Sequence, residues 1–193
     1  MSLASWRSPL ARALHRNRSL VYSRYLQLAT VRSDGRPANR TVVFRGFLEE
    51  TNQLQFVTDA RSQKVEQIEH ISAAEACWYF PNTREQFRLA GQLTLVPANC
   101  PHADLLAARQ RLWQALSDPA RTQFAWADPG QPRNDDVGFA VPSPDATTPL
   151  PTFCLLLLDP DRVDHLELRG DPQNRGLYHR DAAGNWSMQA VNP

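Results

Sequence analysis

Short extended segments separated by polar turns dominate this chain of 193 residues, and this pattern limits its fold more than any other feature. The apolar runs are only a few residues long, and the first ends at Asp34-Gly35, a tight hairpin signal. Such runs at short intervals are typical of an all-β sandwich or barrel. The expected strands cover residues 25–31, 39–47, 54–58, 75–80, 86–97, 153–158, 163–168, 176–180 and 186–190. We therefore predict a mainly β, antiparallel barrel with flanking helices, forming a single domain over residues 1–193.

A few segments have helical rather than extended periodicity. The clearest is 102–116, where leucines recur along one face, and shorter helices are expected at 62–71 and 119–124. Residues 127–152 contain six prolines and no apolar period. We expect a long loop there, of the kind that often forms a lid or a partner contact.

The N-terminal segment, residues 1–20, allows two interpretations. Its arginines and serines, with no acidic residue before Asp34, resemble the composition of an organelle transit peptide. The alternative is a surface helix in which Ser8 is the N-cap, Pro9 is the first helical residue and Leu10 belongs to a narrow apolar stripe. We favour the helix.

Composition and missing motifs exclude several classes of function. The net charge of +1 provides no field that would attract nucleic acid or an acidic membrane. The longest apolar run, 153–158, is far shorter than the roughly 20 residues of a membrane span. Cys77, Cys100 and Cys154 do not form a C-x-x-C motif, and no zinc, P-loop, Rossmann or nucleophile-elbow motif occurs. We therefore expect no bound metal, no nucleic-acid or membrane partner, and a cytoplasmic protein, since the cysteines are unpaired and no credible signal peptide is present.

Two segments combine cations with apolar strands. Arg40 and Arg45 lie five positions apart on one expected strand, where the alternation of side chains sends them to opposite faces. Between Thr58 and Lys64 a strand ends and a helix begins at Ser62, which brings together hydroxyls, free backbone N–H groups and a cation. This combination is typical of an anion site. An ordinary capped helix with a solvated lysine is the alternative.

The order of these segments resembles that of the pyridoxamine 5'-phosphate oxidase family of flavoproteins. The matching segments are LATV…DGRP for the opening hairpin, RTVVFR for the family's R-x-x-x-x-K strand, FVT…SQK for F-Y-T…S-R-K, and QFRLAG for Q-V-R-I-x-G. RGLY…GNW…NP resembles the closing hairpin. The N-terminal helix and the Asp/Pro-rich insertion look closest to a cyanobacterial and plant oxidase-like branch.

The resemblance implies an FMN-binding split barrel, assembled as a homodimer with its two FMN sites at the subunit interface. The implied cofactor-binding residues are Arg40, Val42, Val43, Arg45, Val57, Thr58, Ser62, Gln63, Lys64, Gln86 and Arg175. Arg40, Lys64 and the helix N-terminus at Ser62 would hold the FMN phosphate. Gln86 would reach the flavin from the partner subunit, and Arg175 would stabilise the reduced flavin from the ring edge.

The chain departs from the family on the substrate side. The run Y-x-x-x-R-x-x-x-S, which clamps the substrate phosphate, aligns with Trp113, Ser117 and Arg121. These three residues and Arg45 are the candidate substrate-binding residues, and no catalytic residue is assigned. The favoured function is an FMN-dependent oxidoreductase that transfers hydride from a small anionic substrate, with vitamin B6 phosphate as the named candidate, to flavin N5. The alternative is an FMN-binding protein without B6-oxidase activity, such as a flavin carrier, a sensor or a reductase of another substrate.

Overall fold

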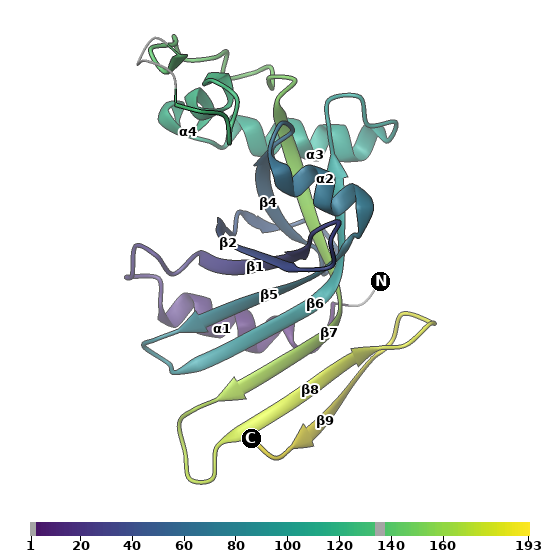
Figure 1. The fold of residues 1–193 in the computed structure, drawn as a ribbon. Coiled ribbons are helices and arrows are strands. Elements are labelled where there is room, and N and C mark those ends of the chain that lie inside the picture. Colours follow the sequence, from purple (N-terminus) through teal and green to yellow (C-terminus); the bar gives the residue numbers. More distant parts are fainter. Residues whose placement is uncertain (1–2, 134–137) are drawn as a thin grey trace.

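A computed structural model, which describes residues 3–133 and 138–193, contains a nine-stranded antiparallel sheet with helices packed around it (Figure 1). The strands are β1 Tyr25–Val31, β2 Pro37–Val43, β3 Gly46–Phe47, β4 Leu54–Asp59, β5 Ala73–Phe80, β6 Glu85–Val96, β7 Phe153–Glu167, β8 Asn174–Arg180 and β9 Trp186–Val191. The helices are α1 Arg7–Arg16, α2 Gln63–His70, α3 Ala103–Gln114, α4 Asp118–Thr122 and the 3-10 helix η1 Gln123–Ala125. The predicted mainly β, antiparallel fold with flanking helices is confirmed.

The sheet divides at β7. Its spatial order is β2-β1-β5-β6-β7-β4-β3, while β8 also pairs with β7, and β9 pairs with β8. One edge of β7 pairs with β6 along nearly its whole length, whereas the other edge pairs with β4 over residues 153–158 and with β8 over 162–167. The sheet therefore splits into two branches beyond β7, which gives the half-open barrel.

The prediction of two strands separated by a turn at residues 159–162 is wrong, because β7 runs continuously through Asp159-Pro160. The register with β6 shifts between Ala90 and Gly91, so that Gly91 faces Pro160 while Ala90 faces Arg162. Asp161 is the extra residue of this β-bulge. A Cβ atom at Gly91 would lie 2.0 Å from the backbone oxygen of Asp159, so only glycine fits at this position.

Helix α1 lies on the surface, as predicted, and its narrow apolar stripe packs into the main hydrophobic core. It begins at Arg7 with Trp6 as the N-cap, so the prediction of Ser8 as the cap is wrong. Trp6 is fully buried and meets Trp186 edge-on with ring centroids 5.8 Å apart, while Leu10 is buried one turn later. Residues 1–2 of the predicted N-terminal helix lie outside the described part of the chain.

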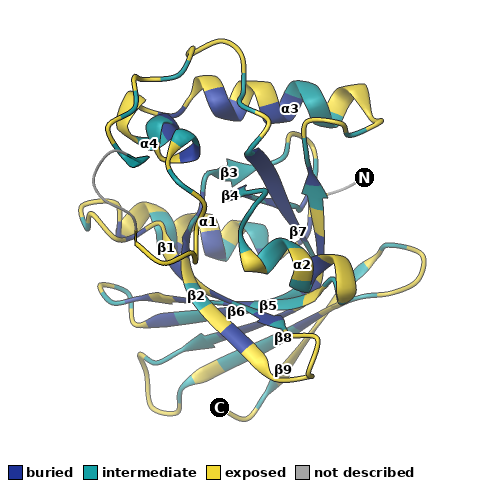
Figure 2. Ribbon diagram, turned by 45° about the horizontal axis from the view of Figure 1, so that its top comes forward, coloured by how far each residue is buried: buried dark blue, intermediate teal, exposed yellow. Residues whose placement is uncertain are grey.

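A second core lies under α3 and α4, where the rings of Trp113, Phe124 and Phe153 pack within 5.0–5.9 Å of one another. Strand β7, which is mostly buried (Figure 2), contributes to both cores, because successive side chains of a strand point to opposite faces. Phe153, Leu155 and Leu157 belong to the second core, and Leu156, Leu158 and Val163 to the main core.

The remaining elements agree with the predictions except around residue 44. The expected strand 39–47 is interrupted: β2 ends at Val43 and β3 begins at Gly46. Residues 127–133 and 140–152 form no helix or strand, as expected, and the part of the predicted loop at 134–137 lies outside the described residues. No helix in residues 3–133 or 138–193 is long and apolar enough to cross a membrane.

Candidate functional site

Arg40 and Lys64 approach each other beside the start of α2. The Arg40 guanidinium, on β2, donates hydrogen bonds to Thr30 Oγ1 at 2.6 Å, Gln67 Oε1 at 2.9 Å and the Leu28 carbonyl oxygen at 3.2 Å. Burial, and secondarily the charge of Arg32, lowers the pKa of Arg40. Neutral acceptors therefore hold the guanidinium in place without neutralising its charge.

Lys64 lies in the first turn of α2. Its Nζ donates to Thr58 Oγ1 at 2.9 Å and to Ser62 Oγ at 2.8 Å. Ser62 Oγ also accepts the backbone N–H of Lys64, so Ser62 is the N-cap that the sequence predicts. Burial, and next the charge of Arg40, lowers the pKa of Lys64. A bound anion would oppose both effects.

No carboxylate forms an ion pair with Arg40 or Lys64 in the described parts of the chain. Asp59 is close enough to act on the pKa of Lys64, but its carboxylate binds Arg61 at 2.7 Å. The cluster is therefore a partly buried pair of cations with two hydroxyls and a helix N-terminus, which is the donor set of a phosphate site.

A cavity of about 640 Å³ opens beside this cluster. Strand β4 contributes Val57, Thr58 and Asp59 to its lining, and Arg61 and Lys64 line it from the start of α2 and the residues just before it. The opposite wall comes from a segment far along the chain, and its lining residues are Gln123, Phe124, Trp126, Ala127, Asp128, Pro129, Gly130, Gln131, Pro132, Arg133 and Phe139. Sequence reasoning missed this wall and Arg61 beside it; the only signal was the run of prolines after residue 127.

The other residues implied for the cofactor do not join this cluster within one chain. Gln63 is exposed on α2, and Val42 is buried in the main core. Val43 and Arg45 belong to the end of β2 and the gap after it. Burial lowers the pKa of Arg45, and its buried Nε has no hydrogen-bond partner among the described residues.

Gln86 and Arg175 lie together on the outer face of the sheet. The registers place Tyr79, Gln86, Leu166 and Arg175 in one cross-strand row, opposite the face that carries the core. Arg175 binds Asp164 through two hydrogen bonds of 2.8 and 3.0 Å, which lower the pKa of Asp164. Strand β8 and helix α2 lie in different parts of the molecule (Figure 1), and neither Gln86 nor Arg175 lines the cavity beside Lys64.

The structure does not form the predicted substrate clamp of Trp113, Ser117 and Arg121. Trp113 is fully buried in the second core and donates its indole N–H to the Asp145 carbonyl at 2.9 Å. Arg121 is 5% exposed, and its guanidinium binds the Asp118 carboxylate and backbone carbonyls at the end of α3, including those of Trp113 and Leu116. Ser117 is exposed and serves as the N-cap residue of α4. Local structure therefore binds both terminal nitrogens of Arg121 and the indole N–H of Trp113, while the buried Nε of Arg121 has no hydrogen-bond partner in the described chain.

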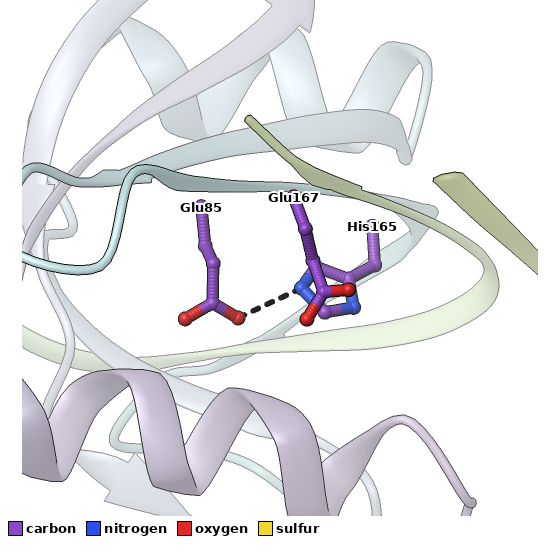
Figure 3. Close-up of side chains that lie close together, drawn as sticks. All are labelled: Glu85, His165 and Glu167. Carbon is purple, nitrogen blue, oxygen red and sulfur yellow. Dashed lines mark hydrogen bonds and ion pairs between the residues drawn. The ribbon is translucent and has the colours of Figure 1, made fainter. Parts of the chain in front are cut away.

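Glu85, His165 and Glu167 form a second polar cluster, between the sheet and α1 (Figure 3). One possible ligand atom from each lies within 4.8 Å of the others, a spacing that suits a metal ion. However, Glu85 and His165 already form a 2.9 Å hydrogen bond, and the imidazole stacks on Phe87 with ring centroids 4.0 Å apart. A structural pair explains Glu85 and His165 without a metal.

Comparisons with known proteins agree with this architecture. Residues 3–97 match the family described as "Pyridoxamine 5'-phosphate oxidase, FMN-binding domain". The chain is 39% identical to pyridoxine/pyridoxamine 5'-phosphate oxidase 2 of Arabidopsis thaliana, over 99% of this chain and 98% of the relative. It is 63% identical to a pyridoxamine 5'-phosphate oxidase-related, FMN binding protein of Nostoc punctiforme, whose crystal structure superposes with a TM-score of 0.97 over the full length of both chains. PhzG of Burkholderia lata shares the fold, with a TM-score of 0.74 and 22% identity over 97% of this chain and 90% of PhzG.

These similarities extend over the complete chain, and the strand order is that of a half-open antiparallel barrel. The chain belongs to the pyridoxamine 5'-phosphate oxidase-like family of FMN-binding split-barrel proteins.

Proposed function

We propose that this protein binds FMN in the cavity beside Lys64 and acts as an FMN-dependent oxidoreductase on a small anionic substrate. The observation that carries the proposal is the pair Arg40 and Lys64, two partly buried cations without a carboxylate partner in the described chain, at the N-terminus of α2. This donor set fits the phosphate dianion of FMN. When bound, FMN supplies the hydride acceptor of the reaction.

The residues of the chain bind and orient the cofactor. Arg40 presents a fork of N–H donors already held by Thr30 and Gln67, while Lys64 and Ser62 supply a point charge and the capped helix N-terminus. Val57 and Thr58 line the cavity beyond the phosphate site, where they would contact the ribityl chain and the ring. The segment 123–133 forms the wall on the far side and limits access of water.

We also propose that two copies form a homodimer in which each chain completes the other's site. Gln86 and Arg175 support this arrangement, because they share the outer face of the sheet and do not line the Lys64 cavity of their own chain. The same face carries Tyr25 and Tyr79, which are 47% and 46% exposed and would be covered by a partner. Light scattering on the purified protein tests the dimer: we expect about twice the 21.8 kDa of one chain, and the mass of a single chain would contradict it.

One observation favours the second function, an FMN-binding protein without B6-oxidase activity, such as a flavin carrier, a sensor or a reductase of another substrate. Trp113 and Arg121, which align with the family's clamp for the substrate phosphate, are buried and hydrogen-bonded to local groups. A site without such contacts loses roughly 1 to 3 kcal/mol for each missing donor. Binding of FMN is common to both functions, and only the substrate separates them.

An absorption spectrum followed by anaerobic addition of pyridoxamine 5'-phosphate distinguishes the two functions. We expect a yellow protein whose flavin band bleaches when the substrate is added, because hydride transfer reduces the bound flavin. A yellow protein that keeps its band would support the second function. A colourless protein that takes up no added FMN would contradict both.

A further inference from the structure

Arg61, between β4 and α2, joins two parts of the chain that are far apart in the sequence. Its Nε and Nη2 bind the two carboxylate oxygens of Asp59 at 2.9 and 2.7 Å. Its Nη1 binds the Trp126 carbonyl at 2.9 Å and the Asp128 carboxylate at 2.7 Å, and Nη2 also reaches the Phe124 carbonyl at 3.4 Å. One guanidinium therefore ties the end of the barrel to a segment more than sixty positions along the chain.

The contacts with Asp59 and with Asp128 play different parts. Asp59 is two residues from Arg61 and its side chain is 17% exposed, so this pair orients the guanidinium locally. Asp128 is remote in sequence and its side chain is 65% exposed. The pair with Asp128 is therefore the one that can break without disturbing the barrel.

The segment held by Arg61 forms part of the wall opposite Lys64. Trp126, Ala127 and Asp128 all line the cavity, together with Thr58 and Lys64 from the barrel. The Trp126 ring packs edge-on against Phe139, and the Ala127 N–H donates to the Gly138 carbonyl at 3.0 Å. Residues 126–127 and 138–139 of the wall therefore also contact each other. Arg61 attaches this self-contained piece to the barrel, next to the predicted phosphate site.

We propose that Arg61 is a positioning residue that holds residues 124–128 against the FMN cavity, and that its ion pair with Asp128 slows the release of bound FMN. This inference rests on the proposed function, because it concerns the same cavity. Arg61 also lines the cavity, but its guanidinium donors are directed to Asp59, Asp128 and the two carbonyls rather than to the hydroxyls of Thr58 and Ser62. Its effect is exerted through the wall.

The test compares the wild-type protein with Asp128→Asn, which removes the charge and leaves the pair of Arg61 with Asp59 in place. Protein loaded with FMN is diluted strongly, and the rise in flavin fluorescence gives the rate constant of release. We expect the variant to release FMN about three to five times faster at low salt, the effect of one partly exposed ion pair. Raising the salt from about 0.02 to about 0.5 M should bring the ratio of the two rate constants towards one, because salt screens the pair in the wild type.

Two further variants keep the result specific. Asp128→Glu preserves the negative charge and should release FMN as slowly as the wild type. If the size of the aspartate side chain mattered rather than its charge, this variant would release FMN as fast as Asp128→Asn. Asp159→Asn removes a comparable ion pair, that of Asp159 with Arg180 at 2.9 Å, which does not line the cavity. We expect this control to release FMN at the wild-type rate.

The outcomes separate this inference from the proposed function. Equal release rates for Asp128→Asn and a wild-type protein that binds FMN would overturn the positioning role and leave FMN binding intact. If the wild type binds no FMN, the proposed function fails, and the role in FMN release fails with it. In that case hydrogen exchange on the ligand-free proteins still tests whether Arg61 fixes the wall. If it does, the amide of Ala127 should exchange faster in Asp128→Asn than in the wild type.

Discussion

Replacing Arg40 and Lys64 together by alanine should abolish the retention of FMN during purification. Each residue places a cation beside α2, and the two come from different elements, so neither can replace the other. Charge-assisted hydrogen bonds contribute about 1.5 to 3 kcal/mol each, so losing both should weaken binding by about 140- to 20,000-fold. The ratio of flavin to protein absorbance after gel filtration, with titration of FMN into the stripped protein, measures the effect.

Arg36→Ala is the matched control, because Arg36 is an exposed cation in the nearby β1–β2 turn and pairs only loosely with Asp34, at 3.8 Å. We expect it to keep its flavin. Both single variants, Arg40→Ala and Lys64→Ala, should lose affinity by smaller factors while remaining folded. A double variant that is purified fully loaded with flavin would rule out this phosphate site.

Replacing Gly91 by alanine should prevent stable folding. The new Cβ atom would lie 2.0 Å from the Asp159 oxygen and 2.7 Å from Pro160 Cα, and both are backbone atoms that cannot rotate away. Relief requires β6 and β7 to separate at the bulge, between the strands that pair most extensively in the sheet. We expect a destabilisation of about 4 kcal/mol or more, or insoluble protein. Urea unfolding followed by tryptophan fluorescence measures it.

Gly176→Ala provides the comparison within the same sheet. A Cβ atom there meets nothing closer than 3.5 Å, an ordinary contact with the Tyr178 ring. This variant should unfold within about 1 kcal/mol of the wild type, since glycine and alanine differ by roughly that amount in regular structure. A Gly91→Ala protein that unfolds at the wild-type urea concentration would show that the two strands are more adaptable than their register indicates.

Local patterns predicted the elements whose conformation depends on nearby residues. The strand at 25–31 and the helix capped by Ser62 follow from alternation and from a hydroxyl at the cap position, and the structure has both. The continuity of β7 was not predictable in this way. Asp-Pro-Asp is a turn signal by itself, and it becomes part of a strand only because Gly91, on another strand, leaves room for the bulge. That information lies some seventy residues away in the chain.

The candidate site shows the same difference between residues placed by local sequence and residues placed by long-range contacts. Arg40 and Lys64 come together as the motifs imply, because each lies on an element that local sequence defines. Arg121 does not line the cavity, because its guanidinium binds the carbonyls at the end of α3 and the Asp118 carboxylate. The wall around Trp126 could not be predicted, because it depends on contacts of Arg61 across more than sixty residues and no periodicity marks it.

The position of β7 between two cores has a mechanical consequence. One uninterrupted strand carries Leu155 and Leu157 into the packing under α3, and Leu156 and Leu158 into the packing of the barrel. Separation of α3 from the sheet would expose one face of β7, while the other face of β7 remains packed in the core of the barrel. The two halves are therefore mechanically coupled, so that loosening at one end of the molecule is transmitted to the other through a shared backbone.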